Sequence, residues 1–181
     1  MKTPSKPGRN ARPERPVRPS PHASRKTAGA SPAAFAPKRI LLPTDFSECS
    51  GKALQSALTL ARQFNAHLVL LHVVEAYPID YLLGLKSAEA ANDWMLEQSR
   101  TRLRQLARQW VDASPVSAES VVRFGKPVQE ICEAARETNA DLIVIGTHGH
   151  TGLKHIQLGS VAERVVRYAR CPVLVVRKTL P

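Results

Sequence analysis

Short apolar runs alternate with longer amphipathic segments from residue 39 onward, and this alternation limits the possible folds more than any other feature. Several of the apolar runs have no polar face, as is typical of strands that are buried on both sides. The segments between them carry apolar residues at helical spacing. The sequence therefore predicts strands in residues 39–43, 67–76, 116–125, 141–146 and 172–178.

Four helices are predicted in the intervening segments. Ser47 is the expected N-cap of the first helix, and Pro127 lies where the third should begin. On the long second helix, the stripe of Trp94, Leu103, Leu106 and Trp110 is expected to face the core, with a partner surface as the alternative. The predicted ranges are 47–64, 88–113, 127–139 and 160–169.

Strict alternation of strands and helices indicates an α/β fold: a Rossmann-like, doubly wound, five-stranded parallel sheet with helices on both faces. The alternating pattern in residues 116–125 favours an edge position for that strand. Open sheets of this kind bind ligands beyond the carboxyl ends of their strands, where the strand order reverses. We therefore expect the site in residues 43–47, 72–76 and 146–150.

Basic charge is concentrated at the N-terminus. Residues 1–38 hold nine of the 26 Lys and Arg, eight of the 14 Pro and one acidic residue, Glu14. Such a segment buries too little apolar surface to fold, so we predict a disordered, basic, Pro-rich tail over 1–38 and a folded domain over 39–178. Nucleic-acid binding is expected, if anywhere, in this tail, because the rest of the chain carries only a modest positive charge.

The expected compartment is the cytoplasm. The three cysteines are widely spaced and include no C-x-x-C pair, which favours neither a disulfide framework nor a zinc site. No apolar run is long enough to cross a membrane as a helix, so no membrane association is predicted.

A glycine-rich segment, GTHGHTGLKHIQLGS, follows the fourth predicted strand and leads into the last helix. Amides near Gly149 and Gly159, with the Ser160 hydroxyl, are suited to phosphate oxygens, since a helix N-terminus favours anions. A metal site and a simple glycine-rich turn are the alternatives. The three histidines of the segment lack a nearby acidic or thiol partner, which disfavours a transition-metal site.

The turn after the first strand has a different chemistry. It reads PTDFSECSG and matches neither a P-loop nor a dinucleotide-binding glycine motif. Asp45 can accept hydrogen bonds from an adenine or a ribose, or face a metal ion. His72, inside an apolar run, is expected to be a hydrogen-bonded core residue. No Ser or Cys stands in a nucleophile-elbow context, so no catalytic residue is assigned.

Taken with this context, the chain resembles the universal stress proteins. Their nucleotide-binding branch carries a glycine, two residues, a glycine, nine residues, and a glycine followed by Ser or Thr, which Gly146, Gly149, Gly159 and Ser160 match here. The resemblance covers residues 38–178. It implies an ATP-binding stress-response sensor or regulator that pairs as a homodimer through its last strand.

The resemblance also implies roles for individual residues. Asp45 and the Val73 backbone would contact adenine, the glycine motif would hold ribose and phosphates, and Mg or Mn would accompany ATP with Asp45 as a possible ligand. The alternatives are a slow metal-dependent ATPase, with at most weak hydrolysis, and a dimeric interaction module that needs no nucleotide. The predicted binding residues are Thr44, Asp45, Val73, Gly146, His148, Gly149, His150, Gly159, Ser160 and Val161.

His150 departs from the family pattern, in which Arg or Lys is frequent at this place, and it generates a prediction. We expect ATP affinity to strengthen as the pH falls from about 8 to about 6, because His150, mostly neutral near pH 7, becomes a cation that pairs with a phosphate. Calorimetric titrations across this range test it, with His150→Asn as the control that should lose the dependence. A dissociation constant that is equally insensitive to pH in both proteins would contradict the prediction.

Overall fold

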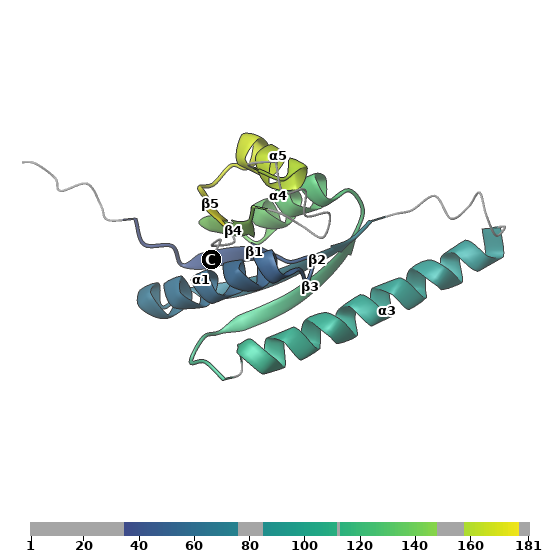
Figure 1. Ribbon diagram of the computed structural model, residues 1–181, viewed down its shortest axis with the longest axis horizontal. Helices are drawn as coiled ribbons and strands as arrows, with labels where there is room; N and C mark the ends of the chain where they lie inside the picture. The colour runs from purple at the N-terminus through teal and green to yellow at the C-terminus, as the bar shows by residue number, and fades with distance from the viewer. Residues whose placement is uncertain (1–34, 76–84, 112, 148–157, 178–181) are drawn as a thin grey trace, which may run out of the picture. The chain divides into compact units, whose positions relative to one another are not determined.

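The computed structural model describes residues 35–75, 85–111, 113–147 and 158–177. Residues 1–34 of the predicted tail lie outside this range, as do residue 178 and the loop residues His148, Gly149 and His150. The elements shown in Figure 1 are β1 (Arg39–Pro43), α1 (Glu48–Phe64), β2 (His67–Val74), α3 (Leu85–Trp110), β3 (Ala118–Phe124), α4 (Pro127–Glu137), β4 (Leu142–Gly146), α5 (Ser160–Tyr168) and β5 (Val173–Val176).

The strands form one parallel sheet in the order β3-β2-β1-β4-β5. The chain starts in the middle of the sheet, builds outward to β3, and then crosses over to add β4 and β5 on the other side of β1. The strand order therefore reverses between β1 and β4. This confirms the predicted doubly wound α/β fold, and it confirms that the third strand lies at an edge.

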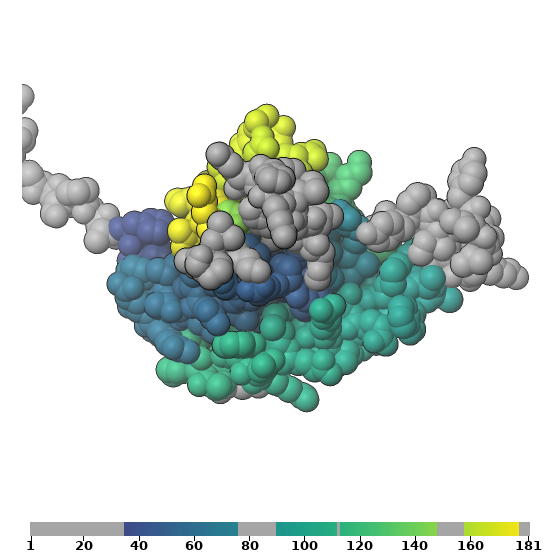
Figure 2. Space-filling view, in the orientation of Figure 1, coloured from purple at the N-terminus to yellow at the C-terminus, as the bar shows by residue number. Residues whose placement is uncertain are grey.

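Two apolar cores, one on each face of the sheet, hold the layers together. Ile40 and Leu42 point into the core beneath α1 and α3, whereas Leu41 points into the core beneath α4 and α5. All three side chains are fully buried. In Figure 2 the surfaces of α1 and α3 adjoin as blue and teal regions, as expected for two helices that cover the same face. A strand buried on both faces in this way explains the continuous apolar runs.

Helix α1 begins and ends where its sequence signals it. The Ser47 side chain accepts a hydrogen bond from the Ser50 amide, which confirms it as the N-cap. At the other end Asn65 adopts a left-handed conformation and its amide bonds to the Ala61 carbonyl. The buried stripe of this helix includes Ala53, Leu54, Ala57, Leu58 and Ala61.

The predicted core stripe of α3 is only partly confirmed. Leu103 is buried and Leu106 packs against the same core, but Trp94 and Trp110 are 65% and 38% exposed. The N-terminal half of α3 extends past the sheet in Figure 1, so an apolar residue there has no strand to cover it. Within the described ranges, neither this helix nor any shorter one is long and apolar enough to cross a membrane.

Close packing of α1 against β4 requires glycine at position 146. A Cβ atom at Gly146 would lie 3.0 Å from the Cys49 sulfur and 3.1 Å from the Cys49 carbonyl carbon. Because Cys49 belongs to the first turn of α1, the missing side chain lets the start of this helix approach the end of β4. Gly146 therefore has a packing role in addition to the binding role that the sequence suggests.

This contact predicts opposite effects for two glycine substitutions. Gly146→Ala should destabilise the protein by about 1–3 kcal/mol, because the backbone on the α1 side of the contact cannot move freely. Gly51→Ala is the matched control: nothing lies within 4 Å of its added Cβ, and alanine in a helix should add up to about 1 kcal/mol. Urea unfolding measures both, and equal stability of the two variants would contradict the packing role.

Candidate functional site

A cleft of ≈ 990 Å³ opens at the carboxyl edge of the sheet. Its floor is formed by the ends of β1, β2 and β4, so it lies at the point where the strand order reverses, as the fold predicts. Helices α3, α4 and α5 contribute its walls. The lining residues used below are Thr44, Asp45, Phe46, Ser50, His72, Val73, Glu75, Trp94, Ser99, Arg102, Pro127, Ile131, Gly146, Thr147, Gly159, Ser160 and Val161.

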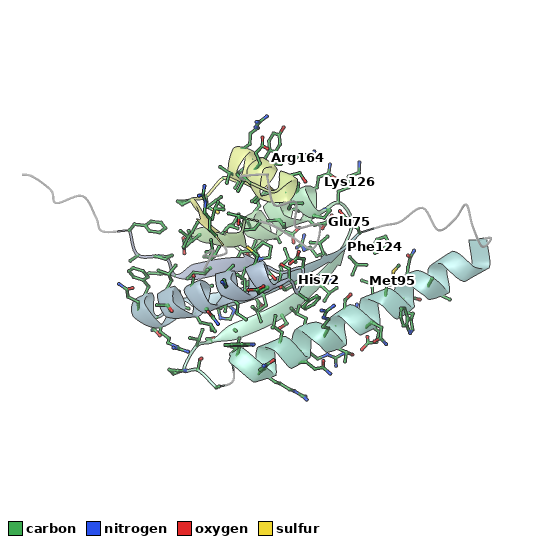
Figure 3. The ribbon with its side chains drawn as sticks, in the orientation of Figure 1. His72, Glu75, Met95, Phe124, Lys126 and Arg164 are labelled. Carbon is green, nitrogen blue, oxygen red and sulfur yellow. The ribbon has the colours of Figure 1, made fainter. Side chains whose placement is uncertain are left out.

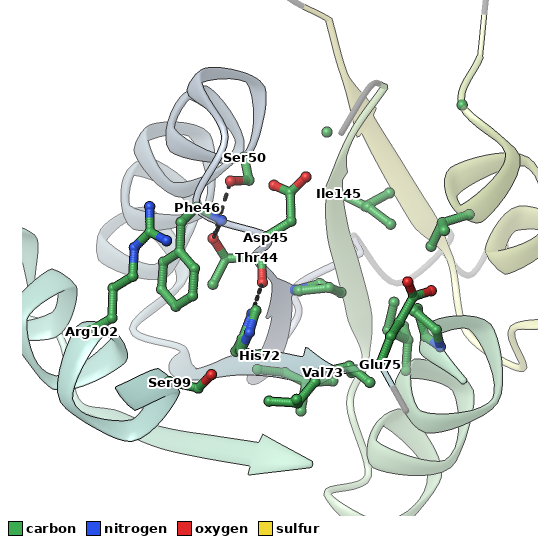
Figure 4. Close-up of a pocket in the computed structure, with 18 of the residues that line it drawn as sticks. Thr44, Asp45, Phe46, Ser50, His72, Val73, Glu75, Ser99, Arg102 and Ile145 are labelled. Carbon is green, nitrogen blue, oxygen red and sulfur yellow. Dashed lines mark hydrogen bonds between the residues drawn. The ribbon is translucent and has the colours of Figure 1, made fainter. Parts of the chain in front are cut away.

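Hydrogen bonds hold the loop between β1 and α1 in one conformation. The Thr44 amide donates to the Leu71 carbonyl at 2.8 Å, and the buried Thr44 hydroxyl donates to the Ser50 hydroxyl at 3.1 Å. The Ser50 hydroxyl in turn donates to the Ser47 carbonyl at 2.9 Å. The Asp45 carboxylate accepts a 3.0 Å hydrogen bond from the Ser47 amide, a turn typical of aspartate. The half-buried Asp45, which Figure 4 shows beside Thr44 at the cleft, is thus fixed through Thr44 before it and through the Ser47 amide after it.

Phe46 has an unusual backbone conformation, with a φ of 64°. A bulky side chain in this region costs on the order of 1–3 kcal/mol and needs support from its surroundings. Its amide donates to the Thr44 hydroxyl at 3.1 Å. Its ring lies 4.5 Å from the His72 ring and 4.4 Å from the guanidinium carbon of Arg102.

The carboxyl end of β2 supplies His72, Val73 and Glu75 to the cleft. Nδ1 of His72 donates a 2.7 Å hydrogen bond to the Thr44 carbonyl, since a carbonyl can only accept. The predicted hydrogen bond of His72 is therefore confirmed, but its predicted place in the core is wrong, because the half-buried ring lines the cleft. Figure 3 shows His72 and Glu75 near this end of β2 and Met95 on α3.

On the opposite side, β4 ends at Gly146 and α5 begins at Ser160. Gly159 is the N-cap of α5 and offers no side-chain oxygen to the first turn. Its own amide donates to the Thr147 carbonyl at 2.6 Å, which fixes the helix start next to the end of β4. The amides of a first helical turn have no acceptor within the helix, so those of Ser160 and Val161 are suited to an anion in the cleft.

The structure brings together every predicted binding residue that it describes. Thr44, Asp45, Val73, Gly146, Gly159, Ser160 and Val161 all line the one cleft, although they come from four separate parts of the chain. The remaining three, His148, Gly149 and His150, lie outside the described residues and stay predictions.

Sequence reasoning missed several side chains that line the cleft from α3, α4 and the loop before α1. Arg102 lies on a long helix whose polar positions give no sign of which face meets a ligand. Pro127 was assigned only to a helix start, and Ile131 only to a helix, yet both line the cleft. Of these residues, Phe46 alone could have been predicted to lie at the site, because it directly follows Asp45 at a strand end.

Among the residues that the structure describes, the charged groups that line the cleft are Asp45, Glu75 and Arg102. Among the described residues, no three His, Cys, Asp or Glu side chains lie close enough together to bind a metal ion. Burial, and secondly the Asp141 carboxylate, raise the pKa of the Cys171 thiol, which favours its protonated, weakly nucleophilic form.

Comparison with known proteins identifies the family. The sequence profile of the universal stress protein family matches residues 37–177, so the chain belongs to that family. It is 40% identical over 144 residues to Universal stress protein MJ0531 of Methanocaldococcus jannaschii. This alignment covers 78% of this chain and 82% of the relative. Universal stress protein MJ0577 of the same organism is 32% identical over 155 residues, covering 78% of this chain and 95% of the relative.

Solved structures show the same fold. The structure of MJ0577 aligns with a TM-score of 0.71 at 29% sequence identity and covers 80% of this chain and 98% of that chain. A universal stress protein crystallised in complex with cAMP aligns with a TM-score of 0.59 at 26% identity and covers 80% of this chain and 99% of its own.

Proposed function

We propose that this protein binds ATP in the cleft at the carboxyl edge of its sheet and acts as a stress-response sensor or regulator. The observation that carries the proposal is the convergence of two kinds of group on one cleft. A fixed carboxylate, Asp45, lies at the end of β1, and the open first turn of α5 lies beyond the end of β4. A nucleotide has matching ends, a base with hydrogen-bond donors and a phosphate chain with negative charge.

The proposal assigns each part of the nucleotide to particular residues of the cleft. Asp45 and the backbone of Val73, with Thr44 beside them, would hold the adenine. Gly146 and Gly159 would permit close approach of the ribose and phosphates. The amides of Ser160 and Val161, with the Ser160 hydroxyl, would bind phosphate oxygens. His148, Gly149 and His150 would continue this cradle, and Mg or Mn would accompany the phosphates. Metal ligation is the alternative role of Asp45 to the adenine contact.

A member of the same family supports an adenine nucleotide as the ligand class. The universal stress protein crystallised with cAMP is 26% identical to this chain in an alignment that covers 80% of this chain and 99% of that protein. Its ligand contains the adenine, ribose and phosphate groups that the cleft is proposed to recognise.

The proposal includes a cytoplasmic homodimer. Strand β5 lies at an edge of the sheet, and Leu174 in this strand is 40% exposed. An exposed apolar edge strand is an aggregation hazard that pairing with a second copy removes. The dimer would therefore form through β5, and sedimentation velocity of the full chain tests it.

Retained nucleotide gives the most direct test of binding. Mass spectrometry of the freshly purified protein after denaturation should detect ATP in a substantial fraction of molecules. Titration calorimetry with ATP and Mg²⁺ should then give saturable binding to nucleotide-free protein. Neither retained nor added nucleotide binding would contradict the proposal and favour an interaction module that needs no ligand.

Ser160→Pro separates the role of the α5 amides from the stability of the helix. Proline at the first helical position fits the preceding Gly159, whose φ of −67° and ψ of 149° are the conformation that proline requires before it. The variant should therefore keep its thermal unfolding temperature yet lose about tenfold or more in ATP affinity, because a donor to a charged phosphate is removed.

Ser160→Ala provides the matched control, because it removes the hydroxyl and keeps the amide. We expect it to lose less affinity than Ser160→Pro in the same calorimetric titration. A folded Ser160→Pro protein with the affinity of the wild type would show that the first turn of α5 does not contact the phosphates.

A further inference from the structure

Among the described residues other than glycine, Phe46 and two others have a positive φ, and only Phe46 lacks a local explanation for it. Asn65 and Asn139 also have positive φ values, of 52° and 50°. Both are asparagines close to the ends of helices, where this residue type tolerates the left-handed conformation. Phenylalanine has no such tolerance, so the conformation of Phe46 depends on contacts with other elements.

Three elements supply those contacts (Figure 4). The Thr44 hydroxyl of the same loop accepts the Phe46 amide at 3.1 Å. On β2, the His72 ring lies 4.5 Å from the Phe46 ring with an interplanar angle of 40°. On α3, the guanidinium carbon of Arg102 lies 4.4 Å from the centre of the Phe46 ring, within the range of a cation–π contact.

His72 is itself fixed, which makes the arrangement a connected unit. Its Nδ1 donates to the Thr44 carbonyl at 2.7 Å, on the residue that precedes Asp45. Asp45 therefore lies between two anchored neighbours, Thr44 and Phe46. A change in the backbone at Phe46 would rotate the peptide that joins it to Asp45 and move the carboxylate in the cleft.

We propose that Phe46 and Arg102 are positioning residues that aim the Asp45 carboxylate at the 6-amino group of adenine, and thereby set the preference for adenine over purines without that group. The inference rests on the proposed ATP-binding function. A carboxylate can only accept hydrogen bonds, and the 6-amino group donates them. Arg102 acts across the cleft from α3, so base selectivity depends on a helix that holds no part of the glycine motif.

The ratio of two affinities tests this role apart from general packing. Calorimetry would compare ATP with purine riboside triphosphate, which lacks the amino group. The wild type should bind ATP at least about tenfold more tightly, since a hydrogen bond to a charged acceptor is lost in the analogue. Asp45→Asn, which removes the charge but keeps one acceptor oxygen, should reduce this preference.

Phe46→Leu and Arg102→Gln should each reduce the preference several-fold, through weaker ATP binding with little change for the analogue. Arg102→Lys keeps a cation near the ring and should retain most of the preference. Arg108→Gln is the matched control on the same helix, because Arg108 is exposed and outside the cleft; it should change neither affinity. Circular dichroism checks that each variant folds. Because the Arg102 side chain is exposed, Arg102→Gln is expected to fold and tests the proposal even if Phe46→Leu does not fold.

The outcomes separate the two proposals. If the wild type fails to bind ATP, both the proposed function and the positioning role are wrong. If ATP binds but the analogue binds equally well, or if the preference is unchanged in both Arg102→Gln and folded Phe46→Leu, only the positioning role is overturned. A loss of stability without a change in the ratio would likewise show that the stack merely packs the loop.

Discussion

Burial of β1 between two layers of helices is the constraint on which the rest of the structure depends. Its side chains point alternately into the two cores, and its neighbours β2 and β4 are held beside it by parallel pairing. Because all these strands run in one direction, their carboxyl ends meet at one edge of the sheet. The loops that leave them there are anchored to the most deeply buried part of the molecule, and this anchoring gives the cleft a defined geometry.

The two sides of the cleft are built by different means. The loop after β1 is held by side-chain hydrogen bonds that join Thr44, Ser50 and Ser47, with Asp45 fixed in a turn. The start of α5 is held by its backbone, through the Gly159 amide and the Thr147 carbonyl. Fixed side chains suit recognition of a base, whereas open backbone amides suit a phosphate, and the proposed function assigns them in this way.

Helix α3 shows how a long amphipathic helix can serve two purposes. Leu103 attaches the C-terminal half of α3 to the sheet, while Trp94 and Ser99, nearer to its N-terminus, form part of a wall of the cleft. Arg102 lies next to the attachment point and contacts Phe46. The contact links a helix without any recognised motif to the loop that carries Asp45, and it is the basis for the selectivity proposed above.

The sequence by itself determined the element order, the parallel doubly wound sheet, the edge position of β3 and the N-cap at Ser47, because these follow from local periodicity and capping chemistry. It also placed Asp45, Val73, Gly159 and Ser160 at strand ends or a helix start, where parallel strands must bring them together. Only the tertiary structure decided that Trp94 is exposed, that His72 lines the cleft and that Arg102 reaches Phe46. Periodicity reports which face of a helix is apolar, but it does not report how far the helix extends past the sheet or which element lies opposite.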